Sequence, residues 1–387
     1  MSKSTNIFFK EQSEITRQKL ELYNGYIKKY AITLLMANFW DGKIFIADLF
    51  SGPGFNGKDK GSPLLLIDTL NELLSNPVLL NKYANPEVIM LFNDKDNIEE
   101  LKTNISNYSV SKHIKLNYES KSFSDILPGL KEIIDKSNIP KFFFLDQFSY
   151  STVSLNDIKT LFSAKNTEIL LFSPVIDLHR FVNAENLKNN KDHKTRKVIE
   201  DYTDKGIGDH YEGDIYKLCD EIVCKLKKEL KSDYIRYILL DDGKRKNALF
   251  YLTRHPLGLI KFNNVAIKLG DYGIGRLDIK KKKNEKEEGF QICLFSEKEI
   301  DEKAICKHAL FESKLIELLT DKEVSNKDII IFSAINWIEV SETNKILKEY
   351  KKQGKLQVRY VNGLNTKGLY ISDKHWNEVI SFIKLKK

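Results

Sequence analysis

The sequence predicts an α/β fold: a doubly wound, Rossmann-like sheet of seven strands that ends in an antiparallel hairpin, followed by a C-terminal winged helix. Short apolar runs alternate with helical patterns over residues 43–174, as expected for a parallel sheet covered on both faces. Two later strand-like runs, 233–242 and 247–255, are joined by a few polar residues, too short a link for a parallel return. Three helical patterns and the strand-like runs 355–360 and 369–372 then favour the winged helix.

The first helix is expected within residues 1–41. Ser13 is a suitable N-cap, and Leu20, Tyr23, Ile27 and Tyr30 recur at spacings of three and four on one apolar face. Strands are then expected at 43–50, 87–94, 113–120, 141–148 and 167–174, with helices at 62–74, 97–106, 124–136 and 154–162 between them. Crossovers between parallel strands are right-handed, which makes the sheet doubly wound.

Changes in composition divide the chain. Residues 1–41 are expected to form an N-terminal helical segment that packs on the core, and residues 42–278 the Rossmann-like domain, with a charged helical insertion at about 177–232. The lysine run Lys280–Lys283 marks residues 279–290 as a charged linker. Residues 291–387 are expected to form the winged helix.

The composition excludes several classes of protein. With 42% hydrophobic residues, 19 Gly and 8 Pro among 387 residues, the chain can bury a large core and is neither disordered nor collagen-like. No apolar run reaches the roughly 20 residues that a membrane span needs, and the 4 cysteines form no CxxC pair. We therefore expect a cytoplasmic protein with no membrane segment and no metal site. The net charge of +8 permits a nucleic-acid partner without requiring one.

A glycine-containing turn follows the first expected strand. In Asp48-Leu49-Phe50-Ser51-Gly52-Pro53-Gly54, the glycines let the backbone approach a ligand, and Asp48 can orient water or an amino group. The next strand ends at Asn93-Asp94-Lys95-Asp96, where Asp94, and after it Asp96, can accept hydrogen bonds from ribose hydroxyls. Together these features predict a nucleoside ligand. The expected cofactor-binding residues are Asp48, Phe50, Gly52, Pro53, Gly54, Asn93, Asp94 and Asp96.

Gly52, Gly54 and Gly57 also satisfy the GxGxxG pattern of dinucleotide-binding proteins. That pattern needs a helix to begin at once, so that the pyrophosphate meets the helix N-terminus. Here Lys58–Gly61 intervene, and Ser62-Pro63 is the better helix start. S-adenosylmethionine (SAM) has no pyrophosphate, so a SAM pocket tolerates this departure. SAM is therefore favoured over a nicotinamide cofactor, which would make the chain an oxidoreductase.

The fourth strand ends at Asp146-Gln147-Phe148-Ser149-Tyr150. Enzymes that methylate amino groups often place an acidic or amide residue and an aromatic ring at this position. The first accepts hydrogen bonds from the target NH2 group, and the second stacks on an extruded base. Asp146, Phe148 and Tyr150 are therefore the candidate catalytic residues. The alternative for Asp146 is that it caps the following helix.

Basic side chains gather on the third helical pattern of the C-terminal region, the element that commonly enters the DNA major groove in a winged helix. The candidate nucleic-acid contacts are Lys345, Lys348, Lys351, Lys352, Arg359 and Lys367. DNA is favoured over RNA as the partner. A protein-docking or purely structural winged helix is the alternative.

These motifs together resemble those of the three-Cys-motif partner proteins (TcmP). Phe8–Ser13 resembles the opening of that family, and Asp48–Gly54 with Gly61–Pro63 resembles its DLFAGPG…GSP signature. Asn93–Asp96 and Asp146–Tyr150 fall where its ND.D and DPFGY elements fall, and Thr253–Leu259 is similar to its T.HP.GL segment. The resemblance covers nearly the full chain.

The resemblance implies a bacterial protein with a class I SAM-methyltransferase fold, often encoded beside a radical-SAM-type three-Cys partner protein. Together with the residues above, it predicts methyl transfer to an amino group of a nucleic-acid base. Gln147 stands where the family has proline, which keeps a second hypothesis open. In that hypothesis the chain is a catalytically inactive SAM-fold scaffold that binds DNA or a partner protein through its winged helix.

Overall fold

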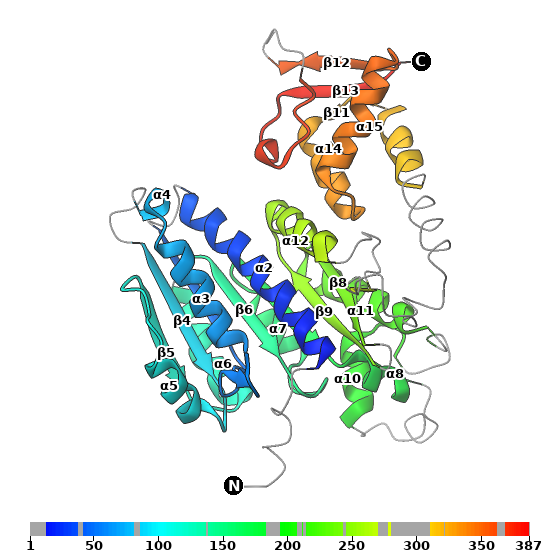
Figure 1. Cartoon of the computed structure of the whole chain (residues 1–387). Helices are drawn as coiled ribbons and strands as arrows, with labels where there is room; N and C mark the ends of the chain where they lie inside the picture. Colours follow the sequence, from blue (N-terminus) through cyan, green and yellow to red (C-terminus); the bar gives the residue numbers. More distant parts are fainter. Residues whose placement is uncertain are drawn as a thin grey trace, which may run out of the picture. The chain divides into compact units, whose positions relative to one another are not determined.

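The computed structural model describes residues 13–37, 42–80, 86–136, 138–182, 194–206, 211, 214–242, 245–269, 278–279, 310–320, 322–361 and 368–386. The chain forms two compact units, Met1–Arg254 and His255–Lys387 (Figure 1). Each unit is built around a sheet of its own.

A seven-stranded sheet forms the core of the first unit. Its strands are β1 (Lys43–Asp48), β4 (Glu87–Asn93), β5 (Ile114–Glu119), β6 (Lys141–Asp146), β7 (Thr167–Ser173), β8 (Ile235–Asp241) and β9 (Lys246–Leu252). They lie in the order β5-β4-β1-β6-β7-β9-β8, and the two-residue strand β10 (Asp278–Ile279) is paired beside β8 as an eighth strand. β9 pairs antiparallel with β7 and β8, and the other pairs among the first seven strands are parallel. This is the Rossmann-like arrangement of the class I methyltransferase type, with its antiparallel last hairpin, and this part of the predicted fold class is confirmed.

Strands β1, β4, β6 and β7 are largely apolar because helices cover both faces of the sheet, whereas the edge strand β5 alternates apolar and polar residues. In β6, Phe142, Phe143 and Phe144 are all fully buried. Successive side chains point to opposite faces, so one strand packs against both helical layers. Phe144 stacks on Tyr23 with ring centroids 4.3 Å apart, whereas Phe143 contacts Phe45 on the other face.

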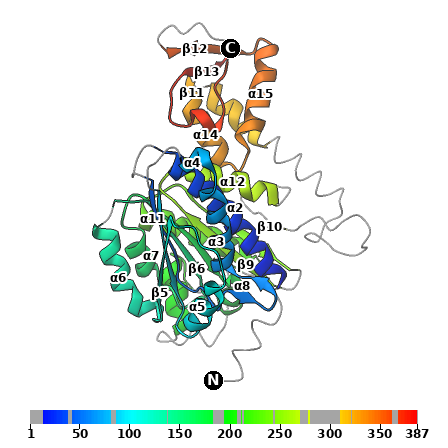
Figure 2. The ribbon, with the colours of Figure 1, turned by 60° about the vertical axis from the view of Figure 1, so that its left-hand side comes forward.

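One face of the sheet is covered by α2 (Glu14–Met36) and α3 (Ser62–Leu74), and Figure 2 shows these helices on the opposite side from α6 and α7. α2 begins where the sequence predicts. The Ser13 side chain accepts a hydrogen bond from the Thr16 backbone N–H at 3.2 Å, as an N-cap does. The predicted apolar face is buried, including Tyr23 and Ile27. The N-terminal helix therefore packs on the core as expected.

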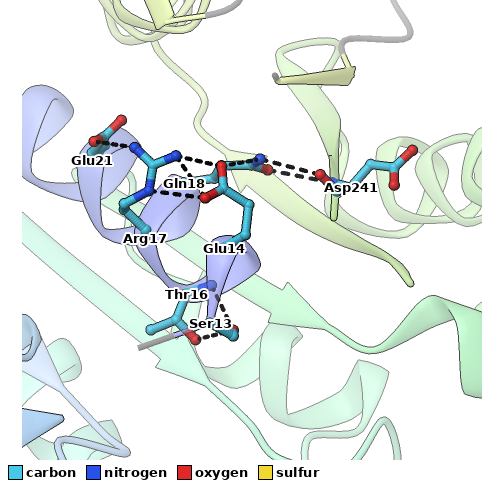
Figure 3. A network of polar contacts seen from close by, with 7 residues as sticks. All are labelled: Ser13, Glu14, Thr16, Arg17, Gln18, Glu21 and Asp241. Atoms are coloured by element: carbon cyan, nitrogen blue, oxygen red, sulfur yellow. Dashed lines mark hydrogen bonds and ion pairs between the residues drawn. The ribbon is translucent and has the colours of Figure 1, made fainter. Parts of the chain in front are cut away.

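The first turns of α2 are anchored to the end of β8 (Figure 3). The Gln18 amide donates to the Asp241 carbonyl oxygen at 3.1 Å, and its oxygen accepts from the Asp241 N–H at 3.3 Å. Glu14 accepts hydrogen bonds from Gln18 and Arg17, and Arg17 also pairs with Glu21 at 3.3 Å. This network holds the start of the helix at the carboxyl edge of the sheet, where β8 ends.

The opposite face is covered by α6 (Phe123–Lys136), α7 (Leu155–Leu161) and α11 (Ile215–Leu230). α8 (Val175–Phe181) and α10 (Lys194–Tyr202) precede α11. Leu218 and Ile222 of α11 belong to the same buried cluster as Phe143 and Leu171 of the sheet. The prediction of an insertion at 177–232 is therefore corrected, because the apolar face of α11 makes it part of the helical layer.

The remaining elements of the first unit are short. They are α4 (Pro77–Leu80), α5 (Ile98–Ser106), and the two-stranded ribbon of β2 (Phe55–Asn56) and β3 (Asp59–Lys60).

The second unit combines helices with a three-stranded sheet. Its elements are α12 (Pro256–Leu269), β10 (Asp278–Ile279), a helix over residues 310–320, β11 (Val324–Ser325), α14 (Asn326–Ile335), α15 (Val340–Lys352), β12 (Leu356–Tyr360), the 3-10 turn η3 (Asp373–His375) and β13 (Ser381–Leu385). β13 lies between β11 and β12 and pairs antiparallel with both. Gly354, with a φ of +71°, follows α15 and allows the chain to turn into β12.

Two features of the second unit differ from the predictions. α12 belongs to this unit, whereas the predicted boundary at 278 placed it in the first domain. The reason is its packing on α14, where the Asn263 amide donates to the Ala334 carbonyl oxygen at 2.6 Å. The run 369–372 is not a strand. Leu369 is buried in a loop and accepts a hydrogen bond from the Ser381 hydroxyl at 2.9 Å, and Ser381 begins the strand that pairs with β12.

Candidate functional site at the carboxyl edge of the sheet

The strand order defines where a ligand can bind. From β1 the chain moves outward to β4 and β5 on one side, and then to β6 and β7 on the other, so the winding reverses between β1 and β6. In open α/β sheets, ligands bind outside the carboxyl ends of the strands at such a switch point. Asp48 ends β1 and Asp146 ends β6. Two of the predicted site residues therefore flank this position.

The turn after β1 requires its glycines. Gly52 and Gly54 have φ values of +63° and +92°, which other residues rarely adopt. A Cβ atom at Gly54 would lie 2.9 Å from Leu101 Cδ1, so a larger residue fits only if Leu101 moves. The Gly54 carbonyl oxygen accepts a hydrogen bond from the Gly61 N–H at 2.7 Å, which closes the β2–β3 ribbon. The glycines therefore allow a tight, buried turn beside the switch point.

The same ribbon explains why the GxGxxG spacing is not a dinucleotide site. β2 and β3 separate the glycine turn from α3, which begins at Ser62 with Gly61 as its N-cap and Pro63 in its first turn, as predicted. The N-terminus of α3 does not follow the turn directly. It therefore lacks the arrangement that holds a pyrophosphate.

The Asp48 carboxyl group is fully buried. It accepts a hydrogen bond from the Ser62 hydroxyl at 2.6 Å and a longer one from the Phe50 N–H at 3.4 Å. Burial raises the pKa of Asp48 to about 7. The Ser62 hydrogen bond opposes this rise, the charge of Asp146 adds to it, and that of Lys19 opposes it. Asp48 therefore changes its charge near neutral pH, as groups at functional sites often do.

The tip of β4 acts as a clamp. The Asn93 amide donates to the carbonyl oxygens of Leu49 and Lys121, at 3.2 and 3.1 Å. One Asp94 carboxylate oxygen accepts from the Gly52 N–H at 3.0 Å, and the other accepts from the N–H groups of Asp96 and Asn97. The carboxylate of Asp94 is thus already engaged with backbone, whereas the Asp96 side chain is exposed.

Asp146 is ion-paired with Lys19 of α2. The Lys19 side chain is 7% exposed, and its ammonium nitrogen also lies 4.4 Å from the centroid of the Phe172 ring. Asp146 does not cap the next helix, because Ser154 caps α7 and forms a capping box with Asp157. The alternative role considered for Asp146 is therefore wrong.

The loop after β6 separates the two predicted aromatic residues. Phe148 is 68% exposed. Tyr150 is half-buried, and its hydroxyl forms a hydrogen bond with the Thr195 hydroxyl of α10 at 2.9 Å. Gln147 is buried and accepts a hydrogen bond from the Val153 N–H at 3.0 Å. Phe148 is therefore the accessible ring, while Gln147 and Tyr150 hold the loop in place.

Two buried hydroxyl groups at this edge have no hydrogen-bond partner among the described residues: those of Ser51, in the glycine turn, and of Tyr23, on α2. Buried polar groups in proteins are nearly always hydrogen-bonded, so an unpartnered hydroxyl points to a water or ligand atom. Burial, and then the charge of Asp48, raise the pKa of Tyr23 well above its usual value. Its hydroxyl is thus available as a neutral donor. Beside the turn, Phe50 stacks on Phe123 with ring centroids 5.5 Å apart.

The predicted nucleic-acid contacts of the second unit differ in their surroundings. Lys345, Lys352 and Arg359 have acidic partners, respectively Glu342 at 2.6 Å, Glu349 at 3.6 Å and Glu323 at 2.7 Å. The Lys351 ammonium lies 3.5 Å from the Tyr360 hydroxyl. Lys348 is exposed. Lys367 lies outside the described residues.

One depression lies away from the predicted site. This depression of about 360 Å³, lined by Lys141, Ser163 and Asn166, lies at the opposite edge of the sheet, where β6 and β7 begin, and none of the predicted site residues line it. The described residues contain no group of three or more His, Cys, Asp or Glu that could hold a metal ion. Nor do they include a helix with both the length and the apolar character needed to cross a bilayer.

Sequence reasoning missed Lys19, Tyr23 and Ser62 as parts of this site. Lys19 and Tyr23 are four residues apart, so they lie on the same face of α2. A lysine on the apolar face of a helix is a signal that it meets a buried acid, and this could have been recognised. Which acid it meets is set by the packing of α2 on the sheet.

Comparisons with known proteins give weak likenesses. No family model and no curated protein matches the chain. Among solved structures, the O-methyltransferase TomG of Streptomyces achromogenes, in complex with SAM, is 11% identical over 66% of this chain and 100% of its own, with a TM-score of 0.32. PKMT2 of Rickettsia typhi is 12% identical over 61% of this chain, with a TM-score of 0.28, and the match spans 53% of its length.

The SAH-bound methyltransferase PaMTH1 of Podospora anserina is 12% identical over 61% of this chain and 88% of its own, with a TM-score of 0.27. Likenesses of this size establish neither cofactor nor substrate for this chain. Its fold is established by the strand order of the sheet.

Proposed function

We propose that this chain is a SAM-dependent methyltransferase that acts on an amino group of a nucleic-acid base. The observation that carries the proposal is the glycine turn that follows β1 at the switch point of the sheet, where β1 and β6 end in the carboxylates of Asp48 and Asp146. The positively charged, amino-acid-bearing SAM needs backbone that it can approach closely and carboxylates nearby. The unpartnered hydroxyls of Ser51 and Tyr23 supply further hydrogen-bonding groups of the kind such a ligand requires.

The residues divide between the parts of SAM. Gly52, Pro53 and Gly54 would contact the amino-acid tail through their backbone, with Asp48 close to its ammonium group. Because the Asp94 carboxylate is engaged by backbone N–H groups, exposed Asp96 is the better acceptor for the ribose hydroxyls, which reverses the order predicted from the sequence. Asn93 would act indirectly, by clamping the turn.

The acceptor would enter beside Asp146 and Phe148. Asp146 accepts hydrogen bonds from the target amino group, and Phe148 stacks on the base. SAM supplies an activated methyl group: the nitrogen lone pair forms the new N–C bond, the electrons of the broken C–S bond pass to sulfur, and the methylated nitrogen releases a proton to water. The contribution of the protein is alignment.

The second unit fits the proposal as a winged helix. A helix, a short strand, two helices and two antiparallel strands follow one another, with β13 between β11 and β12. We extend the proposal to DNA binding by α15, with the exposed Lys348 as its main contact, because Lys345, Lys352 and Arg359 already have acidic partners. The motif resemblance supports a TcmP-type protein that works with a three-Cys partner protein.

Calorimetry with SAM and with S-adenosylhomocysteine (SAH) tests the proposal. Binding of either ligand supports it, and no binding at about 1 mM, a concentration that captures even very weak ligands, removes it. Mass spectrometry of nucleosides after incubation of DNA or RNA with isotope-labelled SAM then identifies the acceptor. Asp146→Ala should lower turnover at least about 100-fold while SAM affinity falls by no more than about tenfold.

The scaffold hypothesis makes a different prediction. An inactive chain would bind DNA with a salt dependence that Lys348→Gln reduces, and would transfer no methyl group to any nucleic acid. Lys345→Gln is the matched control, because Lys345 is paired with Glu342 and its loss should matter less. Methyl transfer by the wild-type chain would exclude the scaffold hypothesis.

A further inference from the structure

The ion pair between Lys19 and Asp146 is unusual for its position. Both groups lie at the switch point, where the proposed methyl donor carries its positive charges, and Lys19 places another positive charge there. Lys19 is held from several sides: by the Asp146 carboxylate, by the Phe172 ring at 4.4 Å, and by the anchoring of α2 to β8 through neighbouring Gln18. A lysine that was merely tolerated would turn its ammonium group to solvent.

The charges around this position can be counted. α2 contributes Lys19 and the neutral Tyr23. The two strand ends contribute Asp146 from β6 and Asp48 from β1. Asp48 accepts a hydrogen bond from the uncharged Ser62 hydroxyl of α3. Asp94 of β4 is turned to the N–H groups of the glycine turn and of α5. With Asp48 ionised, Asp48, Asp146 and Lys19 together carry one net negative charge, and the Asp94 carboxylate, which accepts hydrogen bonds from uncharged N–H groups, adds a further one.

We propose that Lys19 sets this charge, and thereby limits how strongly the site prefers a donor with one net positive charge over its neutral product. This inference rests on the proposed function. SAM carries a sulfonium, an ammonium and a carboxylate, which sum to one positive charge. SAH lacks the sulfonium charge and is neutral. The site is negatively charged, so loss of the methyl group, which removes one positive charge from the ligand, weakens binding and favours release of the product.

If the proposal holds, removing Lys19 and removing Asp146 change the ratio of the SAM and SAH affinities in opposite directions. Lys19→Gln removes a positive charge and should increase the preference for SAM over SAH. Asp146→Asn removes a negative charge and should decrease it. A purely structural ion pair would behave differently, because losing either partner would disturb the same geometry and weaken both ligands together. Lys19 is therefore a positioning residue. It affects the choice between SAM and SAH through the carboxylate charge that its ammonium group offsets.

The test is calorimetric titration of SAM and SAH into the full chain at about pH 8.5, above the pKa of Asp48. We expect the wild type to prefer SAM by about tenfold, which corresponds to about 1.4 kcal/mol. Lys19→Gln should raise the ratio of the two affinities several-fold, Asp146→Asn should bring it close to unity, and Lys19→Arg should keep the wild-type value. Because each ratio is measured on one preparation, a partly unfolded variant still reports it correctly.

Lys28→Gln is the matched control. Lys28 lies on the same helix and pairs with Glu72 at the surface, so its loss should leave the ratio unchanged. A ratio that moves in the same direction in Lys19→Gln and Asp146→Asn, or moves in neither, overturns the inference. If the wild type binds SAM and SAH equally, the inference fails while the proposed function survives. If it binds neither, the proposed function itself has failed.

Discussion

The two edges of the sheet each bury a carboxyl group whose pKa is raised to about 7, and their surroundings differ. At the carboxyl edge, Asp48 lies near the charges of Lys19 and Asp146 and near hydroxyls without partners. At the amino edge, Glu168 accepts hydrogen bonds from the hydroxyls of Tyr26 at 2.5 Å and Thr253 at 3.1 Å, and burial alone raises its pKa. A shifted pKa therefore does not mark a functional site by itself. The charged groups around it distinguish the two edges, because buried hydroxyls without partners among the described residues also occur near Glu168, on Tyr30 and Thr167.

The largest effect on stability should come from the amino edge. Glu168→Ala removes a buried acceptor of two hydroxyl hydrogen bonds and leaves a cavity, so the free energy of unfolding should fall by about 3 kcal/mol. Urea unfolding near pH 6 measures this change. SAM affinity should be unaltered, since Glu168 lies at the far end of β7 from the site. Glu168→Gln keeps an acceptor and should cost less; an equal cost in both variants would contradict the hydrogen-bond explanation.

A smaller loss of stability, with a loss of ligand binding, should follow from Gly54→Ala. The φ of +92° is costly for alanine, and its Cβ would meet Leu101 Cδ1 at 2.9 Å, so we expect the free energy of unfolding to fall by about 2 kcal/mol. SAM affinity should fall with it, because the turn must shift. Gly129→Ala is the control: Gly129 lies in α6 with open space around it, and alanine there should add roughly 0.5–1 kcal/mol. Wild-type SAM affinity in Gly54→Ala would argue against the turn as the binding site.

The smallest effect should come from Ser62→Ala, and it should appear as a change with pH. The Ser62 hydrogen bond lowers the pKa of Asp48, so its loss should raise that pKa above about 7. Because the folded-state pKa exceeds the usual value of 3.8, the protonated carboxyl group favours the folded state, and this stabilisation is lost as pH rises through the folded pKa.

In Ser62→Ala, the loss of stability attributable to Asp48 should therefore extend to higher pH. SAM binding, which needs the ionised form, should also begin at higher pH. Thermal unfolding and calorimetry across pH 5–9 measure both effects, with Thr253→Val at the amino edge as the control. A pH profile of SAM binding that matches the wild type would rule out Asp48 as the group that titrates.

The order of helices and strands followed from local patterns. The apolar runs of β1, β4, β6 and β7 reflect burial on both faces, and the short link between β8 and β9 allows only an antiparallel hairpin. The start of α2 at Ser13 and that of α3 at Ser62 also follow from the residues at those positions. The hairpin strand at 381–385 did not, because its pairing with β12 depends on a loop that folds back and is held at Ser381 by hydrogen bonds to Asn326.

The sequence by itself determined which residues end the strands: Asp48, Asp94 and Asp146 could be placed at one edge because parallel strands share a direction. Tertiary structure alone decided what each carboxyl group does there. The Asp94 carboxylate accepts a hydrogen bond from the Gly52 N–H, and the Asp48 carboxyl group accepts one from the Ser62 hydroxyl. Asp146 forms an ion pair with Lys19, which is 127 residues away in the chain. Hydrogen bonds and ion pairs depend on distances of a few ångströms between side chains, and only the packing of α2 and α3 on the sheet sets those distances.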